Sequence, residues 1–204
     1  MTTFVTSDLD PTEQYKLVTG LVVPRPIGWI GTYDAEGQPN LAPYSFFQAV
    51  SGSPPVVLFS GGRANDRPGS KEKDSVVHAR ESGVFTCNLV NKTLAEGMNA
   101  SSASLPRGES EFALAGLTPV RGDKVGAPRV AEASASMECE VIKIVELDPP
   151  SSSTVVFGQV KAFHVDDDIL DGTRINHDRL DAIGRMAGSG YVTTKDGFDL
   201  TRPQ

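Results

Sequence analysis

The sequence is poor in the residues that disulfides and transition-metal sites require. It contains two cysteines, three histidines and one tryptophan among 204 residues. Cys87 and Cys139 form no C-x-x-C pair, and each lies in an apolar, strand-like stretch, so we expect buried thiols rather than a disulfide. The histidines have no ligand-like spacing, and Asp166–Asp168 lacks the alternating pattern of a calcium loop. No metal site is predicted.

The sequence also lacks a long apolar run and an excess of basic residues. No stretch approaches the roughly 18 apolar residues that span a bilayer, and the N-terminus has neither the basic nor the apolar region of a signal peptide. We therefore expect a cytoplasmic protein without a membrane partner. A formal net charge of −7 opposes binding to the phosphate backbone of nucleic acids. The length and ordinary composition fit one globular domain over residues 1–204.

Signatures of acyl transfer and of nucleotide-binding loops are missing as well. No serine lies in a nucleophile-elbow pattern, and no Ser or Cys is paired with a histidine in such a motif. The glycine-dense stretch 184–190 has neither the Walker lysine nor a Rossmann strand–turn–helix setting. Chemistry supplied by a bound cofactor remains the natural interpretation.

What is present is a succession of short, strand-like segments, which predicts a mainly β protein with peripheral helices. We expect helices near Tyr15, over 76–82 with Gly83 as its end, and over 93–100 with Thr93 and Glu96 as a capping box. Strands are predicted over 17–23, 25–33, 40–47, 56–60, 84–90, 136–147 and 154–165. A long excursion covers about 101–130, and we expect it to cover a dimer partner or to border the ligand cleft. A loop-rich C-terminal segment begins near 166.

The strand from Asn40 to Phe47 carries features that a plain core strand should lack. Pro43 has no N–H for a sheet ladder, so it belongs at an edge, a bulge or a ligand-binding face. Free backbone groups, Asn40 and the Ser45 hydroxyl could bind the polar edge of a ring-shaped cofactor, with Trp29 as an apolar wall. The alternative is an edge strand with a chance proline, and the residues alone favour that alternative.

A second candidate lies at the entrance of the helix that follows. Between Gly61 and Lys73 four basic residues outnumber two acidic ones, although the protein as a whole is acidic. Asp74 or Ser75 is expected to cap the helix, which places Lys73 beside its N-terminus. Free N–H groups, the helix dipole and a lysine together favour phosphate. A solvated basic loop is the alternative, and composition by itself favours it.

Five stretches of the sequence form a distinctive succession: Arg25-Pro-Ile-Gly-Trp-Ile30, Asn40-Leu-Ala-Pro-Tyr-Ser-Phe-Phe47, Lys73-Asp-Ser75, Phe85-Thr-Cys-Asn-Leu-Val90 and Gly184-Arg-Met-Ala-Gly188. Taken together they resemble the flavin reductase-like family of FMN-binding split β-barrels. The resemblance runs from about Tyr15 to the end of the chain, and its specificity lies in the order of the stretches. It implies a six-stranded antiparallel Greek-key split β-barrel, a homodimer, and non-covalent FMN near the subunit interface. The long middle segment and the tail are similar to the longer, flavoredoxin-like branch.

The resemblance also implies which residues hold the cofactor. Along the isoalloxazine and ribityl chain it implies Thr32, Ala42, Pro43, Tyr44 and Ser45. Around the phosphate it implies Ser60, Arg63, Lys73, Asp74 and Ser75, and it implies that Arg185 closes the pocket. His177, in the acidic C-terminal loop, is a weaker candidate for contact with substrate or nicotinamide.

Three functions are compatible with these features. The first is an oxidoreductase that transfers hydride from NADH or NADPH to FMN and passes electrons on to free flavin, oxygen or a protein acceptor. The second is an FMN-holding electron carrier without a nicotinamide site. The third is a binding module that holds flavin without turnover. Hydride transfer on the flavin needs no catalytic acid or base, although Ser45 and His177 are candidates for tuning it.

Overall fold

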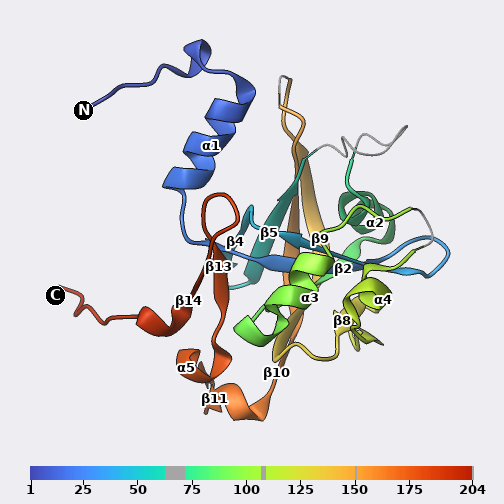
Figure 1. Cartoon of the computed structure of the whole chain (residues 1–204). Coiled ribbons are helices and arrows are strands. Elements are labelled where there is room, and N and C mark those ends of the chain that lie inside the picture. The colour runs from blue at the N-terminus through green and yellow to red at the C-terminus, as the bar shows by residue number, and fades with distance from the viewer. Residues whose placement is uncertain (63–71, 107–108, 150, 204) are drawn as a thin grey trace.

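A curved antiparallel sheet forms the body of the molecule. The computed structural model describes residues 1–62, 72–106, 109–149 and 151–203 (Figure 1). The main sheet has seven strands in the order β3-β2-β6-β9-β10-β5-β4, rather than the six that the resemblance implied. Its strands are β2 (Gly28–Tyr33), β3 (Pro39–Tyr44), β4 (Phe47–Gly52), β5 (Pro55–Gly61), β6 (Val84–Asn88), β9 (Ala135–Glu146) and β10 (Thr154–Val165).

The sheet curls because its two edge strands are neighbours in the chain. β3 and β4 lie at opposite edges of the hydrogen-bond order, yet only Ser45 and Phe46 separate them in sequence. The curl brings Phe47 of β4 against Gly28 of β2, where a Cβ atom would lie 2.5 Å from the Phe47 ring. Because Gly28 has no side chain, β4 at one edge of the sheet can approach β2 near the other edge.

Both faces of β2 are buried, each in a different core cluster. Trp29 packs with Leu41, Met98 and Phe112, whereas its neighbour Ile30 packs in the other cluster, which includes Phe59 and Phe85. Adjacent side chains of a strand point to opposite faces, so β2 separates the two clusters.

Helices and small sheets cover this body. Helix α2 (Asp74–Ser82) packs on β2 and β3 and ends at Gly83, with φ of 73°, as predicted. The excursion contains α4 (Glu111–Ala115), β7 (Pro119–Arg121) and β8 (Pro128–Val130), and it follows α3 (Ala95–Ala100). At the C-terminal end, β13 (Ile183–Arg185) joins β1 (Arg25–Pro26) and β14 (Tyr191–Thr193) in a three-stranded sheet. The remaining elements are β11 (Leu170–Asp171), β12 (Arg174–Ile175), α5 (His177–Leu180) and four 3₁₀ turns, Thr6–Asp8, Lys92–Leu94, Asp167–Ile169 and Thr194–Asp196.

Two predicted strands differ from the structure. The strand expected over 40–47 is divided, because β3 ends at Tyr44 and β4 begins at Phe47. The strand expected over 17–23 is wrong. Residues 17–21 of the expected 17–23 strand belong to helix α1 (Pro11–Leu21). Asp10 accepts hydrogen bonds from the N–H groups of Thr12 and Glu13, and the Glu13 side chain accepts from the Asp10 N–H. This capping box, with Pro11 in the first turn, outweighs the weak β preference of the residues that follow.

The predicted capping box at the third helix is also wrong. The Asn91 side chain, rather than Thr93, accepts the hydrogen bond from the Leu94 N–H, and a 3₁₀ turn precedes α3. The helix itself lies inside the predicted range of 93–100.

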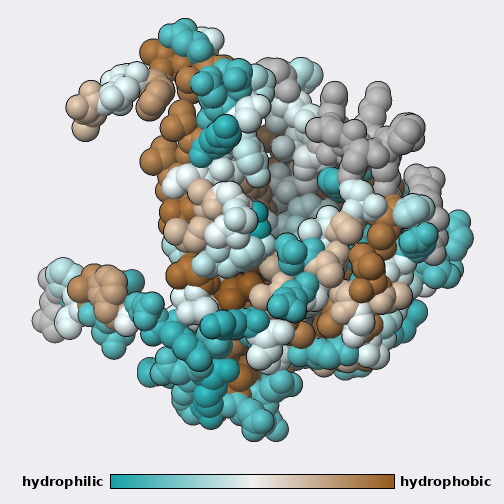
Figure 2. Space-filling view, in the orientation of Figure 1, coloured by the Kyte–Doolittle hydropathy of each residue, from teal (hydrophilic) through white to brown (hydrophobic). Residues whose placement is uncertain are grey.

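Helix α1 stands apart from the body, and part of its surface is apolar. Figure 1 shows the N-terminal segment and α1 along one side of the molecule, and Figure 2 shows brown, hydrophobic residues along its outer edge. Tyr15, Val18 and Leu21 are 62%, 52% and 79% exposed. Their spacing of three residues places them on neighbouring parts of one helix surface.

The buried carboxylate of Glu138 anchors the excursion to the sheet. Glu138 is fully buried on β9 and accepts hydrogen bonds from the N–H groups of Asp123, Lys124 and Val125, at 2.8, 2.7 and 2.7 Å. His164 Nε2, on β10, is hydrogen-bonded to the same carboxylate. Burial raises the pKa of Glu138, but these hydrogen bonds outweigh burial and lower the pKa to about 2.

Neither cysteine is positioned for reaction. Cys87 and Cys139 are free and buried, as predicted. Burial raises the pKa of the Cys87 thiol to about 12 and that of Cys139 well above its usual value. None of the helices in the described part of the chain is both long and apolar enough to cross a bilayer.

Candidate functional site

The outer edge of β3 explains why this strand tolerates two prolines. The Leu41 N–H points away from β2 and donates to Glu111 Oε2 at 3.2 Å, and the Pro39 carbonyl accepts from the Ser110 hydroxyl at 2.7 Å. Pro43 has the same parity along the strand, so its nitrogen and carbonyl also face outward. The missing N–H of Pro43 therefore removes no hydrogen bond between β2 and β3. The outward carbonyl of Pro43 is an acceptor at the edge of the strand.

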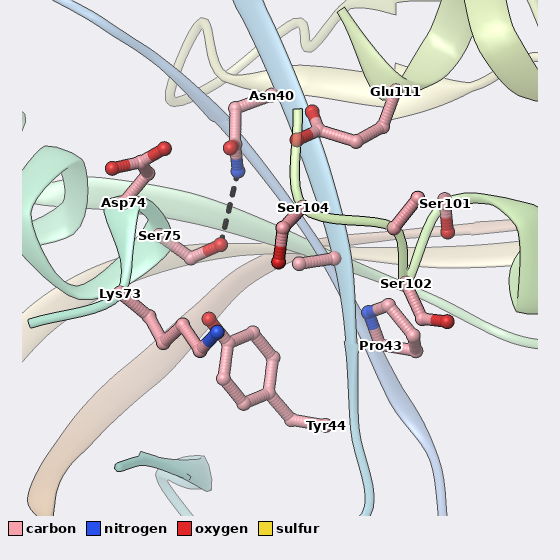
Figure 3. A pocket seen from close by; sticks show the side chains of 12 residues that line it. Asn40, Pro43, Tyr44, Lys73, Asp74, Ser75, Ser101, Ser102, Ser104 and Glu111 are labelled. Carbon is pink, nitrogen blue, oxygen red and sulfur yellow. Dashed lines mark hydrogen bonds between the residues drawn. The ribbon is translucent and has the colours of Figure 1, made fainter. Parts of the chain in front are cut away.

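A hollow lies beside this edge, between β3, α2 and the loop after α3. Its volume is about 130 Å³, and Asn40, Ala42, Pro43 and Tyr44 form its β3 side. Lys73, Asp74 and Ser75 form the α2 side. Figure 3 shows the Lys73 side chain extending toward the hydroxyl end of Tyr44. We call this space the first hollow.

Lys73 is the N-cap of α2. Its backbone is extended, and its side chain makes no capping hydrogen bond, so the helix begins at Asp74 rather than after an Asp74 or Ser75 cap. The lysine side chain and the positive end of the helix dipole therefore meet at one corner of the first hollow.

A chain of hydrogen bonds runs under the floor of the first hollow. Asn40 Nδ2 donates to Thr32 Oγ1 at 3.3 Å and to Ser75 Oγ at 3.0 Å, as Figure 3 shows for the second bond. His78 Nδ1 lies 3.2 Å from Thr32 Oγ1, and the Ser75 hydroxyl lies close enough to Tyr44 to influence the pKa of its phenol. Since Ser75 Oγ accepts from Asn40, its own proton is available for Tyr44. The Tyr44 hydroxyl can then donate its proton into the hollow.

Tyr44 is held in its neutral form. Burial raises the pKa of the Tyr44 phenol well above its usual range, the hydrogen bond from Ser75 lowers it, and the nearby carboxylates of Asp74 and Glu111 raise it further. A phenol in this state is a hydrogen-bond donor to a ligand at any physiological pH.

The excursion supplies the remaining wall of the first hollow, which agrees with one of its two expected roles, although the sequence did not show which of its residues face the site. Residues 101–104 and Glu111 line it, and Glu111 is 6% exposed. Ser101 accepts a hydrogen bond from Trp29 Nε1 and donates to the Met98 carbonyl. The run of serines after α3 was the feature of the sequence that could have indicated this wall. Only the fold shows that these residues face β3.

A second hollow adjoins the first. Pro43 and Ser102 line both spaces, and the second has a volume of about 300 Å³. Ser45, Arg25 and Arg185 also line it, and Arg25 Nε donates to Ser45 Oγ at 3.3 Å. We call this space the arginine hollow.

A third hollow, on the other side of Asn40, has the opposite charge. Its volume is about 500 Å³, and the six carboxylates that line it are those of Asp34, Glu36, Asp74, Glu81, Glu109 and Glu111. Among the described residues that line it, His78 alone is basic. An anionic group is therefore disfavoured at this end of the site.

Comparison with known proteins decides the family. Residues 20–182 match the model of the flavin reductase like domain. The chain belongs to the flavin reductase-like family. A relative from Aquifex aeolicus, an uncharacterized protein, is 39% identical over 190 residues, which cover 93% of this chain and 94% of the relative.

Solved structures of similar proteins extend this result. Nitrilotriacetate monooxygenase component B from Bacillus cereus is 32% identical, with a TM-score of 0.92 and coverage of 98% of both chains. A protein with a split barrel domain from Shewanella frigidimarina is 22% identical, with a TM-score of 0.81 over 100% of this chain and 99% of its own. The fold is therefore that of the split barrels, and family membership implies flavin binding.

Most residues that the flavin reductase-like resemblance implied lie around the two hollows. Ala42, Pro43, Tyr44, Lys73, Asp74 and Ser75 line the first hollow, together with Asn40. Pro43, Ser45 and Arg185 line the arginine hollow. Ser60 is half-buried near the end of β5, and a Cβ atom on the next residue, Gly61, would lie 3.5 Å from the Tyr44 ring. Arg63 lies outside the described residues.

Two of the predicted cofactor residues lie behind the lining of the hollows. Trp29 and Thr32 are fully buried and line none of the hollows described here. Trp29 belongs to a core cluster and reaches the site only through Ser101, and Thr32 reaches it only through Asn40. Both side chains support the wall of the first hollow rather than forming it. His177 is exposed at the start of α5 and lines none of these hollows either.

One cluster has the composition of a metal site but is explained without a metal. Ligand atoms of Asp123, Glu138 and His164 lie within 4.8 Å of one another. The Glu138 oxygens already accept three backbone N–H groups, whose dipoles stabilise an anion and oppose a cation. We interpret this cluster as the anchor of the excursion.

Proposed function

We propose that this protein is an NAD(P)H-dependent oxidoreductase that binds FMN non-covalently and reduces it. The observation that carries the proposal is that Tyr44 and Lys73 line one hollow, although they come from an edge strand and from the entrance of a helix. The proposal requires both elements to contact a single phosphorylated ring system. Membership of the flavin reductase-like family supports it.

The charges around the first hollow suggest how FMN lies there. Asp74 and Glu111 are carboxylates of the described lining, and Lys73 is its cation. The phosphate is therefore proposed at the Lys73 corner, beside the start of α2 and away from Glu111. A volume of about 130 Å³ is below the roughly 300 Å³ at which ligand pockets begin. The ring system is then proposed to lie along the open edge of β3.

The chain itself supplies binding and orientation. FMN, when bound, supplies the hydride-accepting chemistry. The outward Pro43 carbonyl offers an acceptor, and the Tyr44 hydroxyl, oriented through Ser75 and Asn40, offers a donor. Ser45 accepts from Arg25, so its own proton is available for the polar edge of a ring. These three groups are our candidates for orienting the isoalloxazine.

An absorption spectrum and a steady-state assay test the function. We expect purified protein, or protein soaked in FMN, to show bands in the near ultraviolet and the blue. We also expect it to oxidise NADH or NADPH when FMN is added. Protein that stays colourless after soaking would contradict flavin binding. Bound flavin without turnover of either nucleotide would contradict the first function. Photoreducible bound flavin that exchanges electrons only with a protein donor would then favour the second function, an electron carrier.

We also propose a homodimer, with α1 in the interface. The exposed Tyr15, Val18 and Leu21 support this, since grouped apolar side chains on a surface mark contact sites. Light scattering on the eluting protein is expected to give twice the chain mass. Leu21→Lys should lower the measured mass toward that of one chain, and Lys16→Gln, on the same helix, should not.

A further inference from the structure

Two arginines face each other in the three-stranded sheet at the C-terminal end. Arg25 of β1 and Arg185 of β13 are direct partners in the antiparallel register. Residues directly opposite each other extend their side chains on the same face, and like charges in such pairs are destabilising. Both arginines line the arginine hollow. This arrangement calls for a compensating anion.

The protein does not provide that anion in its described residues. Arg25 is 5% exposed, and its guanidinium donates to the carbonyls of Thr19, Val22 and Met186 and to the Ser45 hydroxyl. All four partners are uncharged, although the Thr19 and Val22 carbonyls lie at the C-terminal end of α1, whose dipole compensates part of the charge of Arg25. The other lining side chains of the hollow are also neutral apart from Arg185, although the chain contains 26 acidic residues. A buried cation without a carboxylate partner is costly.

Arg185 is held in position while part of its guanidinium remains available. It is hydrogen-bonded to the Tyr191 hydroxyl and to the Gly188 carbonyl, and it lies 4.6 Å from the centre of the Tyr191 ring. A guanidinium has five N–H donors in a planar fork that matches carboxylate and phosphate oxygens. These contacts fix the plane of Arg185 and leave further donors for a ligand.

We propose that the arginine hollow binds the anionic group, a carboxylate or a phosphate, of the second substrate that exchanges electrons with the flavin. Calling the bound molecule a substrate rests on the proposed function, whereas the binding of an anion in this hollow does not. Pro43 and Ser102 line both this hollow and the first, so a molecule anchored by Arg25 and Arg185 lies next to one anchored at Lys73. The acidic third hollow lies on the other side of Asn40 and disfavours the same anion.

Calorimetric titration of the purified protein tests the site, and it needs no flavin. The probes are nicotinate and nicotinamide, which share a ring and differ in charge, and NADP⁺. Arg185→Gln is expected to weaken binding of nicotinate, NADP⁺ or both by about tenfold, as expected for one charge-assisted contact, and to leave nicotinamide unchanged. A loss for NADP⁺ alone assigns the site to phosphates of the dinucleotide, and a loss for nicotinate alone assigns it to a carboxylate acceptor.

Matched variants separate this effect from misfolding and from the general charge of the protein. Lys161→Gln removes one positive charge on β10, where Lys161 pairs with Glu140, and should change none of these affinities. Arg185→Lys keeps the charge and should show an intermediate loss, and it replaces the glutamine variant if that one unfolds. The proposal is overturned if neither anion binds the wild-type protein or if Arg185→Gln leaves both anions unaffected. It is also overturned if Arg185→Gln weakens FMN but not riboflavin, because the anion is then the flavin's own phosphate.

Discussion

Trp29 Nε1 donates a hydrogen bond to Ser101 Oγ at 2.9 Å, across 72 positions of the sequence. The bond joins the fully buried side chain of β2 to the loop that lines the first hollow. It connects the stability of the core to the shape of the candidate site.

Ser101→Ala should destabilise the fold by about 1–3 kcal/mol, because it leaves the buried indole N–H without its partner. Denaturant unfolding measures the loss. In the Trp29→Phe background the same substitution should cost clearly less, since the orphaned donor is gone. Equal costs in both backgrounds would show that the hydrogen bond does not contribute to stability.

Lys73→Ala should weaken FMN binding by roughly 10- to 100-fold, the equivalent of about 1.5–3 kcal/mol for a charge-assisted bond. Riboflavin, which has no phosphate, should bind both proteins equally. Fluorescence titration gives the affinities, and Lys161→Ala is the control for loss of charge. An unchanged FMN affinity would mean that the phosphate lies elsewhere.

Asn40→Asp tests the direction of the hydrogen-bond chain with almost no change in shape. A carboxylate at position 40 accepts from Ser75 instead of donating to it, so the Ser75 proton turns toward position 40 and away from Tyr44. The Ser75 oxygen then competes with a ligand for the proton of the Tyr44 hydroxyl. We expect weaker flavin binding and a shifted absorption band of the bound flavin. Tyr44→Phe should produce a similar band shift.

A control is needed because Asn40→Asp also adds a negative charge near Asp74 and Glu111. Glu36→Gln removes one charge from the neighbouring acidic hollow. If the added charge alone explains the effect of Asn40→Asp, the double variant Glu36→Gln/Asn40→Asp should have the wild-type spectrum. If hydrogen-bond direction explains it, the shift persists.

Acid should reveal the contribution of Glu138. Its pKa is about 2 in the folded protein and near 4.5 when unfolded, so its stabilising effect is complete above pH 4.5 and is lost as the pH falls toward 2. The difference corresponds to about 3 kcal/mol. Glu138→Gln should be much less stable than the wild type at pH 7 and should converge with it near pH 2. Glu140→Gln, on the same strand but exposed, should follow the wild-type pH curve. A gap between Glu138→Gln and wild type that stays constant with pH would contradict this assignment.

Much of the architecture could be predicted from local patterns. The predicted 154–165 strand matches β10, and the 136–147 strand lies within one residue of β9 at each end, because their alternation matches a half-buried sheet surface. Helix α1 was only partly predicted, since Leu17–Leu21 has β-branched and apolar character. The Asp10–Glu13 capping box was visible in the sequence, and it predicted the helix better than the apolar character of residues 17–21 predicted a strand.

The candidate site was predicted only where its residues lie in recognisable stretches. Asn40–Ser45 and Lys73–Ser75 were identified, whereas the loop 101–104 and Glu111 were not. Their contact with β3 depends on the path of the excursion, which no local pattern describes. The position of Trp29 behind the lining was not predictable for a related reason. An aromatic residue next to a ligand-binding strand can face the ligand or the core. Because both faces of β2 are buried, the Trp29 side chain faces the core.

The sequence by itself determined most strands of the main sheet, the unusual prolines of β3 and the lysine at the start of α2, because these depend on propensity and on neighbours in the chain. It also carried the family. Only the tertiary structure decided that Arg25 and Arg185, 160 residues apart, become direct partners, and that Tyr44 and Lys73 share one hollow. Strand pairing and the curl of a sheet bring such residues together through long-range contacts, and a one-dimensional pattern contains no distance between them.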